Sequence, residues 1–292
     1  MNQLTNNHEI HIAVLSDIHS NHIALQTCLD YLKERHINTY IFLGDYVSNC
    51  AYPEKTMQII YSHAQKYTCY FIRGNREEML INHTNVIEDN WHIPSTSSGS
   101  VLYTYNHLNE NDIQFFRNMK HSDCIDIEGF PRIAICHGSM DSANDIITPE
   151  NAAKYFDTYS TSLILCGHTH VMGYQNYLHG KVINTGSVGT PVNDIGDAEF
   201  VILHGTTSGW SEEFVTVPFD KKKVVQELNE SGLIEQSKMF GRMIRDLLET
   251  NQDRWDELLN CANQICIKET GHPNNNMDEK YLEMAATIIG IE

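Results

Sequence analysis

The chain has 292 residues, of which 41% are hydrophobic and 20% are charged, and its formal net charge at pH 7 is −18. This apolar content excludes intrinsic disorder, and the acidic charge argues against a reader of nucleic-acid backbones, because such proteins need a basic surface. No apolar run approaches the roughly 18 residues of a membrane helix, and no basic segment precedes the first apolar run. We therefore expect a cytoplasmic protein that does not enter a membrane.

Apolar runs of strand length recur along the chain, each followed by a polar loop. The first three are continuous and β-branched, and helix-like patterns separate them, which predicts a parallel α/β sheet. Later runs follow one another closely, with a turn predicted at His179-Gly180, so the second half should add antiparallel strands. The predicted strands are residues 10–16, 40–43, 68–72, 132–136, 162–166, 171–177, 182–184, 199–203 and 213–217.

The composition changes near Pro218, after which the patterns become helical. We predict one α/β domain over residues 1–218 and a helical C-terminal appendage over residues 219–292. The segment 76–121 is predicted to be an insertion near the active site, with one helix at 111–119, because long insertions after a strand usually carry function. Apolar stripes in the appendage indicate core packing and offer an oligomer contact. They contain Phe240, Met243, Ile244, Leu247 and Leu248, then Trp255, Leu258, Leu259, Ala262, Ile265 and Cys266.

Five short polar motifs stand where predicted strands end. The carboxyl ends of parallel strands meet at the ligand crevice of an open α/β sheet, so these loops should bring two Asp, one Asn and four His together. Each motif alone is common, and only the ordered set indicates a site. The motifs are Asp17-Ile18-His19, Gly44-Asp45, Gly74-Asn75, His137-Gly138 and Gly167-His168-Thr169-His170.

This donor set is typical of a site for two metal ions. Imidazole, carboxylate and amide oxygen without thiolate suit Mn, Fe, Zn, Co or Ni rather than Ca or Mg alone. Seven ligands are too many for one ion and fit two if one carboxylate bridges. In extended backbone, residues two apart point to the same side, so Asp17 and His19 should bind one ion, and His168 and His170 follow the same rule. Glycine precedes three of the ligands, which lets the backbone turn sharply there.

The ordered motifs D-x-H, G-D, G-N, H and G-H-x-H resemble those of the calcineurin-like metallophosphoesterase superfamily. The segments SDIHSNHIALQTCL, LGDYV, RGN and INTGSVGTPV are similar to its bacterial and archaeal phosphodiesterase-type branch, and the resemblance extends over residues 10–218. It implies a four-layer αββα sandwich. It also implies that Asp17, His19 and His170 hold the first ion. Asn75, His137 and His168 would hold the second, with Asp45 bridging both.

The activity that this resemblance implies is metal-dependent hydrolysis of a small phosphomonoester, phosphodiester or nucleotide, by attack of a hydroxide held between the two ions. Asp45, His137 and Arg76 are the expected catalytic residues. The expected partner is a small phosphorylated substrate, not a nucleic-acid polymer or a membrane. Two alternatives stay open: a protein serine/threonine phosphatase, and a metal-binding scaffold without turnover, because a retromer subunit shares this fold and acts as a scaffold.

One position departs from the superfamily pattern. Many members have a histidine after the asparagine of the third motif, where it helps the leaving group, but Arg76 stands there in Gly74-Asn75-Arg76-Glu77. Arginine does not donate a proton usefully at neutral pH, although it can pair with a phosphoryl oxygen, and Glu77 could orient it. Two other interpretations are that Arg76 is a surface residue at a helix start, and that His22 supplies the proton.

Overall fold

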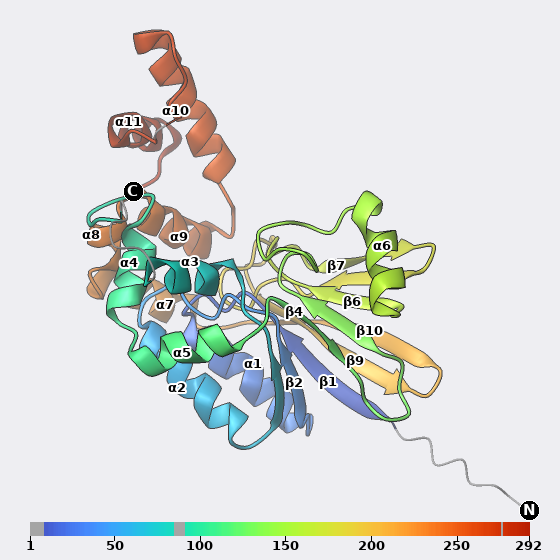
Figure 1. Cartoon of the computed structure of the whole chain (residues 1–292). Coiled ribbons are helices and arrows are strands. Elements are labelled where there is room, and N and C mark those ends of the chain that lie inside the picture. Colours follow the sequence, from blue (N-terminus) through green and yellow to red (C-terminus); the bar gives the residue numbers. More distant parts are fainter. Residues whose placement is uncertain (1–8, 85–90, 276) are drawn as a thin grey trace, which may run out of the picture.

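Two five-stranded β-sheets packed face to face form the centre of the protein (Figure 1), in a computed structural model that describes residues 9–84, 91–275 and 277–292. The strand order is β10-β9-β1-β2-β3 in the first sheet and β4-β5-β6-β8-β7 in the second. Helices cover the outer side of each sheet. The α/β class and the αββα sandwich predicted from the sequence are confirmed.

The first sheet combines a parallel half with an antiparallel half. β1 pairs in parallel with β2, and β2 with β3, whereas β9 lies antiparallel between β1 and β10. Helices α1 and α2 make the two parallel crossovers, as the alternating strand and helix patterns predicted. The bounds are β1 (Ile10–Leu15), α1 (His22–Glu34), β2 (Thr39–Phe42), α2 (Pro53–Ala64), β3 (Thr68–Phe71), β9 (Ala198–Thr206) and β10 (Gly209–Val217).

The second sheet is parallel at its centre and antiparallel at both edges. β5, β6 and β8 run parallel, and the hairpin of β7 and β8 confirms the turn predicted at His179-Gly180. The edge strand β4 was not predicted, because its sequence SDCI has only two apolar residues. The bounds are β4 (Ser122–Ile125), β5 (Ile133–Cys136), α6 (Pro149–Tyr159), β6 (Leu163–Cys166), β7 (Gly173–Tyr177) and β8 (Gly180–Asn184).

Alternating side chains of the central strands explain the layers. Ile12 and Val14 of β1 pack between the two sheets in one cluster with Ile135 of β5. Their neighbours Ala13 and Leu15 point the other way, into the cluster that α1 and α2 cover. A smaller cluster lies between the second sheet and α6. The period of two residues along a strand thus places each sheet between two apolar layers.

The segment 76–121 is more helical than its sequence predicts. The helix expected at 111–119 is α5 (Glu110–Asn118), but α3 (Asn75–His83) and α4 (Gly99–Asn106) were not predicted. Helix α3 begins at a candidate ligand, so the insertion starts directly at the site. Part of this segment, residues 85–90, lies outside the described residues.

The C-terminal segment divides into two layers of helices (Figure 1). The first three helices add Val224, Leu228, Leu233, Ile244 and Leu248 to the same cluster as α1 and α2. The last two form a small core of their own with one face of α9. Within the described part of the chain, no helix has the length and apolarity needed to cross a bilayer. The bounds are α7 (Lys221–Glu230), α8 (Leu233–Ser237), α9 (Met239–Thr250), α10 (Trp255–Thr270) and α11 (Glu279–Ile289).

Candidate metal centre

The loops after five strands carry all seven candidate ligands to one edge of the sandwich. This follows from topology, because β1, β2 and β3 run parallel, as do β5 and β6, so their carboxyl ends meet. Asp17 and His19 follow β1, Asp45 follows β2, Asn75 starts α3, His137 follows β5, and His168 and His170 follow β6.

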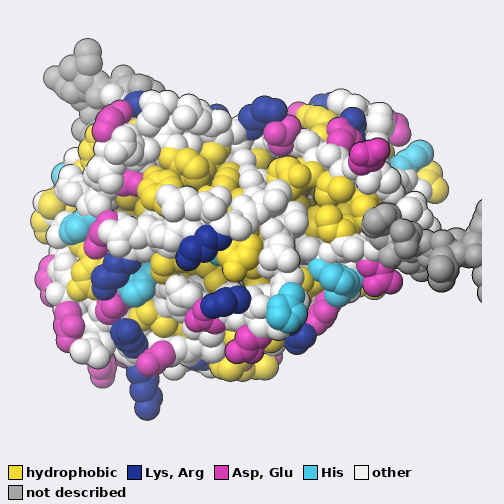
Figure 2. Space-filling view, turned by 90° about the horizontal axis from the view of Figure 1, so that it is seen from below, with side chains coloured by type: hydrophobic (Ala, Val, Ile, Leu, Met, Phe, Trp, Pro, Cys, Tyr) yellow, Lys and Arg dark blue, Asp and Glu magenta, His cyan; other side chains and the backbone are white. Residues whose placement is uncertain are grey.

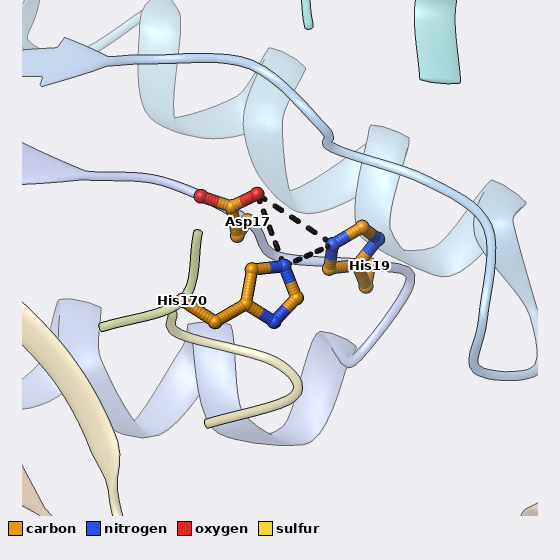
Figure 3. Close-up of side chains that lie close together, drawn as sticks. All are labelled: Asp17, His19 and His170. Carbon is orange, nitrogen blue, oxygen red and sulfur yellow. Dashed lines mark hydrogen bonds and ion pairs between the residues drawn. The ribbon is translucent and has the colours of Figure 1, made fainter. Parts of the chain in front are cut away.

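Asp17, His19 and His170 form a first group of converging ligand atoms (Figure 3). Asp17 Oδ1 lies 3.3 Å from Nε2 of His170 and 3.6 Å from Nε2 of His19. The two imidazole Nε2 atoms are 3.0 Å apart. These are the three residues that the family resemblance assigns to the first ion.

Asp17, Asp45 and His137 form a second group. His137 Nε2 is 3.5 Å from Asp45 Oδ1 and 3.1 Å from Oδ1 of Asn75. The other oxygen of Asp45 is 3.7 Å from Nε2 of His19, so this carboxylate faces both groups. The His168 ring lies 5.2 Å from the His137 ring between centroids and belongs to neither group. Both Asp17 and Asp45 therefore lie between the two ligand groups, whereas the sequence predicted this only for Asp45.

Backbone carbonyls fix which nitrogen two of the histidines present. His137 Nδ1 lies 2.8 Å from the carbonyl oxygen of Leu43, and His170 Nδ1 lies 2.9 Å from that of Thr190. A carbonyl only accepts hydrogen bonds, so each Nδ1 carries a proton, and Nε2 is the nitrogen that faces the carboxylates and can bind a metal ion when the ring is neutral. Sequence reasoning missed these two orienting contacts, because a backbone carbonyl has no signature in the side-chain pattern.

The electrostatics of the cluster favour bound cations. The Asp17 and Asp45 side chains are 0% and 3% exposed, and Asp17 Oδ1 has no hydrogen-bond donor among the described residues. Burial raises the pKa of Asp17, but the charges of His170 and His137 outweigh it and hold that pKa well below its usual value. For His137 the balance is reversed: burial lowers its pKa, and the nearby Asp45 and Asp17 raise it overall. Buried carboxylates beside imidazole lone pairs fit divalent metal ions.

Five candidate ligands have left-handed backbone conformations. The φ angles are 54° at Asp17, 50° at His19, 53° at Asp45, 70° at His168 and 59° at His170. The argument from extended backbone was therefore wrong, because β1 and β6 end before these residues and left-handed turns direct the side chains instead. Such conformations cost about 1–3 kcal/mol each and concentrate at functional sites.

Two glycines allow the loops after β2 and β3 to lie against each other. A Cβ atom on Gly74 would lie 2.2 Å from Asp45 Oδ1, and one on Gly44 would lie 2.4 Å from the Gly74 nitrogen. Gly44 also has a φ of 99°, which strains any other residue. Glycine is therefore needed at both positions so that the two loops can lie in contact, and at Gly44 also so that the backbone can turn.

Glu77 positions these loops, which corrects the expectation that it orients Arg76. It is fully buried, and its carboxylate accepts hydrogen bonds from the backbone N–H groups of Gly74 at 2.8 Å, Asp45 at 2.8 Å and Tyr46 at 2.9 Å. Burial raises the pKa of Glu77 to about 7. The spacing of Glu77 three residues after Gly74, at a helix start, is the signal that could have revealed this role.

Arg76 lies at the metal centre, whereas His22 is engaged elsewhere. The Arg76 backbone N–H donates to Asp45 Oδ1 at 2.9 Å, and its Nε lies 3.9 Å from Asp45 Oδ2, buried without a hydrogen-bond acceptor among the described residues. His22 Nε2 instead lies 2.8 Å from Glu227 of α7, which also binds Lys55 at 3.1 Å. His22 therefore joins α1 to the C-terminal helices.

Three known proteins that resemble this chain come from archaea and bacteria. A curated relative, an uncharacterized protein of Methanocaldococcus jannaschii, is 26% identical over 241 residues, which span 77% of this chain and 94% of that protein. A hypothetical protein of Pyrococcus horikoshii superposes with a TM-score of 0.68 at 20% identity, over 82% of this chain and 97% of the other. A metallophosphoesterase of Sphaerobacter thermophilus gives a TM-score of 0.63 at 20% identity, over 83% and 99%.

The family resemblance seen in the motifs is confirmed over most of the α/β body. Residues 10–172 match the family model described as calcineurin-like phosphoesterase. The matched region begins with β1 and ends two residues after His170, so it contains all seven candidate ligands. The chain belongs to the calcineurin-like phosphoesterase family.

Proposed function

We propose that the protein hydrolyses a small phosphoester at a centre of two divalent metal ions. The observation that carries this proposal is the pair of ligand groups joined by two buried carboxylates, Asp17 in both groups and Asp45 facing both. One ion could not use all of these donors at once. A site for two ions leaves no carboxylate of the cluster without a cation.

The proposed division of the ligands is the one that the family resemblance implies, and the contacts support it for the first ion. Asp17, His19 and His170 would hold one ion, and Asn75, His137 and His168 the other, with Asp45 between them. When bound, such ions supply Lewis acidity toward the phosphoryl oxygens and toward the attacking water. Mn, Fe, Zn, Co and Ni are the candidates, because most of the donors are imidazoles.

Arg76 gives the site a fixed positive charge from the protein itself. Its side chain is 24% exposed, and its Nε is held near Asp45 without a hydrogen-bond acceptor. A phosphoryl oxygen at the centre would provide that acceptor. The guanidinium would then stabilise the negative charge that develops on the phosphoryl group as the leaving oxygen departs.

A small substrate is favoured over a nucleic-acid polymer. The net charge is −18, and on the face shown in Figure 2 the Lys and Arg side chains are interspersed with Asp and Glu instead of forming a basic stripe. That face therefore lacks the continuous basic surface that binding of a phosphate backbone needs. A cytoplasmic location and an oligomer formed through the C-terminal helices stay predictions.

A scaffold without turnover is the less favoured alternative. Five ligand residues in left-handed conformations destabilise the fold, and a purely structural role gives no reason to retain that strain. An enzyme does, because strained loops hold ligands in one geometry. A protein phosphatase would use the same centre, so the substrate must be tested directly.

The deciding experiment measures metal content and hydrolysis together. The purified protein should hold about two transition-metal ions per chain. In a panel with added Mn²⁺ that contains monoesters, diesters, nucleotides and phosphopeptides, it should hydrolyse the small esters fastest. Asp45→Asn should abolish both metal binding and turnover, whereas the matched Asp30→Asn, at an exposed position of α1, should change neither. Bound metal with no hydrolysis of any ester would support the scaffold, and fastest hydrolysis of phosphopeptides the protein phosphatase.

A further inference from the structure

A pocket of about 160 Å³ opens beside the metal centre, and the C-terminal helices form much of its wall. Arg76 and His170 line it on the side of the centre. Phe240 and Leu247 of α9 and Trp255 of α10 line it on the other side. Segments more than sixty residues apart in sequence therefore meet at one cavity, directly next to two residues of the candidate site.

The wall that the C-terminal helices supply is apolar and aromatic. The rings of Phe240 and Trp255 lie 5.8 Å apart between centroids and are tilted by 41°. Leu247 is only 8% exposed, so most of this side chain already packs against neighbouring residues. Asp253, an exposed residue just before α10, adds one carboxylate to the lining.

The volume and the lining together select a ligand group. An apolar cavity of about 150 Å³ in another protein binds benzene, so a pocket of this size accommodates one six-membered ring. Tilted aromatic neighbours contact a planar ring favourably by its face or its edge. A ring with an N–H or amino group could also donate a hydrogen bond to Asp253.

We propose that α9 and the start of α10 form a specificity pocket for one planar six-membered ring carried by the phosphoester. This inference rests on the proposed function, because it takes the phosphoryl group to lie at Arg76 and His170. With the phosphoryl group there, a substituent on phosphorus can point into the pocket, because the same two residues line it. Phe240, Leu247 and Trp255 are then specificity-determining residues, and phosphoesters with short aliphatic substituents are poorer ligands.

The test compares two phosphonates that carry the same charged group and are not hydrolysed. Calorimetry on the metal-loaded full-length protein should show phenylphosphonate binding at least about tenfold more tightly than methylphosphonate, a ratio typical of one group in an apolar pocket. Trp255→Leu and Phe240→Leu should each lower this ratio toward one. Tyr174→Leu removes a ring that is 55% exposed on β7 and does not line this pocket, so it should leave the ratio unchanged.

The outcomes separate the pocket from the proposed function. Equal affinity for the two phosphonates in the wild type, or a ratio that survives both wall substitutions in variants with wild-type melting temperatures, would overturn the pocket even if esters are hydrolysed. A ratio that behaves as expected without hydrolysis of any ester would overturn the proposed function and leave the pocket standing. If either Trp255→Leu or Phe240→Leu does not fold, the other variant still tests the pocket, since each removes a different ring.

Discussion

The strand-end loops and the C-terminal helices contribute to the same cavity, but in opposite ways. The loop after β6 and the start of α3 bring His170 and Arg76 to it, held by the left-handed backbone of His170 and by the hydrogen bond from the Gly74 backbone to Glu77. The C-terminal helices bring Phe240, Leu247 and Trp255, held by ordinary apolar packing. On the proposed function, the loops would determine which reaction the site supports, and the helices would determine which substituent the substrate carries.

The largest expected effect comes from removing the helices altogether. A chain that ends at Pro218 should fail to give a soluble folded protein, because Val224, Leu228, Ile244 and Leu248 are buried in the cluster shared with α1 and α2. A chain that ends at Asn251 keeps these residues and loses α10 and α11. It should fold and bind metal but discriminate poorly between the two phosphonates.

Expression, circular dichroism and metal analysis of both truncations check this prediction. Every candidate ligand precedes Pro218. If the C-terminal helices had no part in folding, the chain of residues 1–218 would keep its metal ions. A soluble chain of residues 1–218 with full metal content would show that the appendage is independent of the main core.

The sequence predicts the ligands in the loops better than the pocket residues in the helices, and the reason is physical. Metal ligands such as Asp17 and His170 are recognisable because their motifs follow apolar strands in one fixed order, and the sequence contains that order in full. Trp255 and Leu247 belong to apolar stripes, and an apolar stripe that lines a pocket has the same sequence pattern as one that fills a core. Only the packed fold shows which part of the stripe is left uncovered.

Within the loops, the backbone was the part that sequence reasoning missed. Left-handed turns at Asp17 and His19 replace the extended backbone that we expected, because β1 ends at Leu15. The carbonyls of Leu43 and Thr190, which orient two imidazoles, are backbone groups that any residue would supply. Residue type therefore predicts the ligands, and tertiary contacts decide how they point.

Substitution of Arg76 should have the second largest effect. Arg76→Ala should raise the activation free energy by about 2–4 kcal/mol, comparable to loss of a fixed oxyanion donor. Among the described residues, the guanidinium is the only positive charge within 4 Å of the Asp45 carboxylate that does not belong to a candidate ligand. Metal content should not change. Since no neighbouring acid is expected to protonate the leaving group, wild-type rates should depend steeply on the leaving-group pKa.

A series of aryl phosphates of graded leaving-group pKa measures this dependence in the wild type, Arg76→Ala and Arg76→His. The histidine variant should flatten the slope, because an imidazole with a pKa near 6.5 can act as a general acid. A wild-type slope near zero would mean that a proton donor already exists, and His22→Gln would then be the next variant to measure.

A smaller effect is expected from one added methyl group. Gly74→Ala should weaken metal binding about 10- to 100-fold, the range found when groups that orient metal ligands are lost, because the new Cβ would lie 2.2 Å from Asp45 Oδ1. The matched control is Gly173→Ala, where a Cβ meets nothing within 4 Å among the described residues. Metal titrations of both variants check the comparison, and equal affinities would show that the Asp45 loop moves without loss.

A change in the main body, away from both regions, should have the smallest effect on the metal centre, and it separates pH effects on the fold from those on the site. His63 of α2 is 8% exposed, and its ring lies 4.2 Å from the Tyr40 ring and 4.4 Å from the Tyr67 ring between centroids. Burial, with a smaller contribution from the charge of Lys66, lowers the pKa of His63 from 6.5 to about 4. Between these values the unfolded chain binds the proton and the folded chain does not.

Stability should therefore fall as the pH drops from about 6.5 toward 4, with a His63 contribution that approaches 1.4 kcal/mol per pH unit, and should not depend on this group above about pH 7. Urea unfolding from pH 4.5 to 7.5 measures it, with His63→Asn as the variant that cannot take up the proton. The difference in unfolding free energy between wild type and variant should shrink toward acid pH. A difference that stays constant over this range would mean that His63 takes up its proton at the same pH in the folded and the unfolded chain. The acid limb of any activity profile would then belong to the metal centre and not to the stability of the body beneath it.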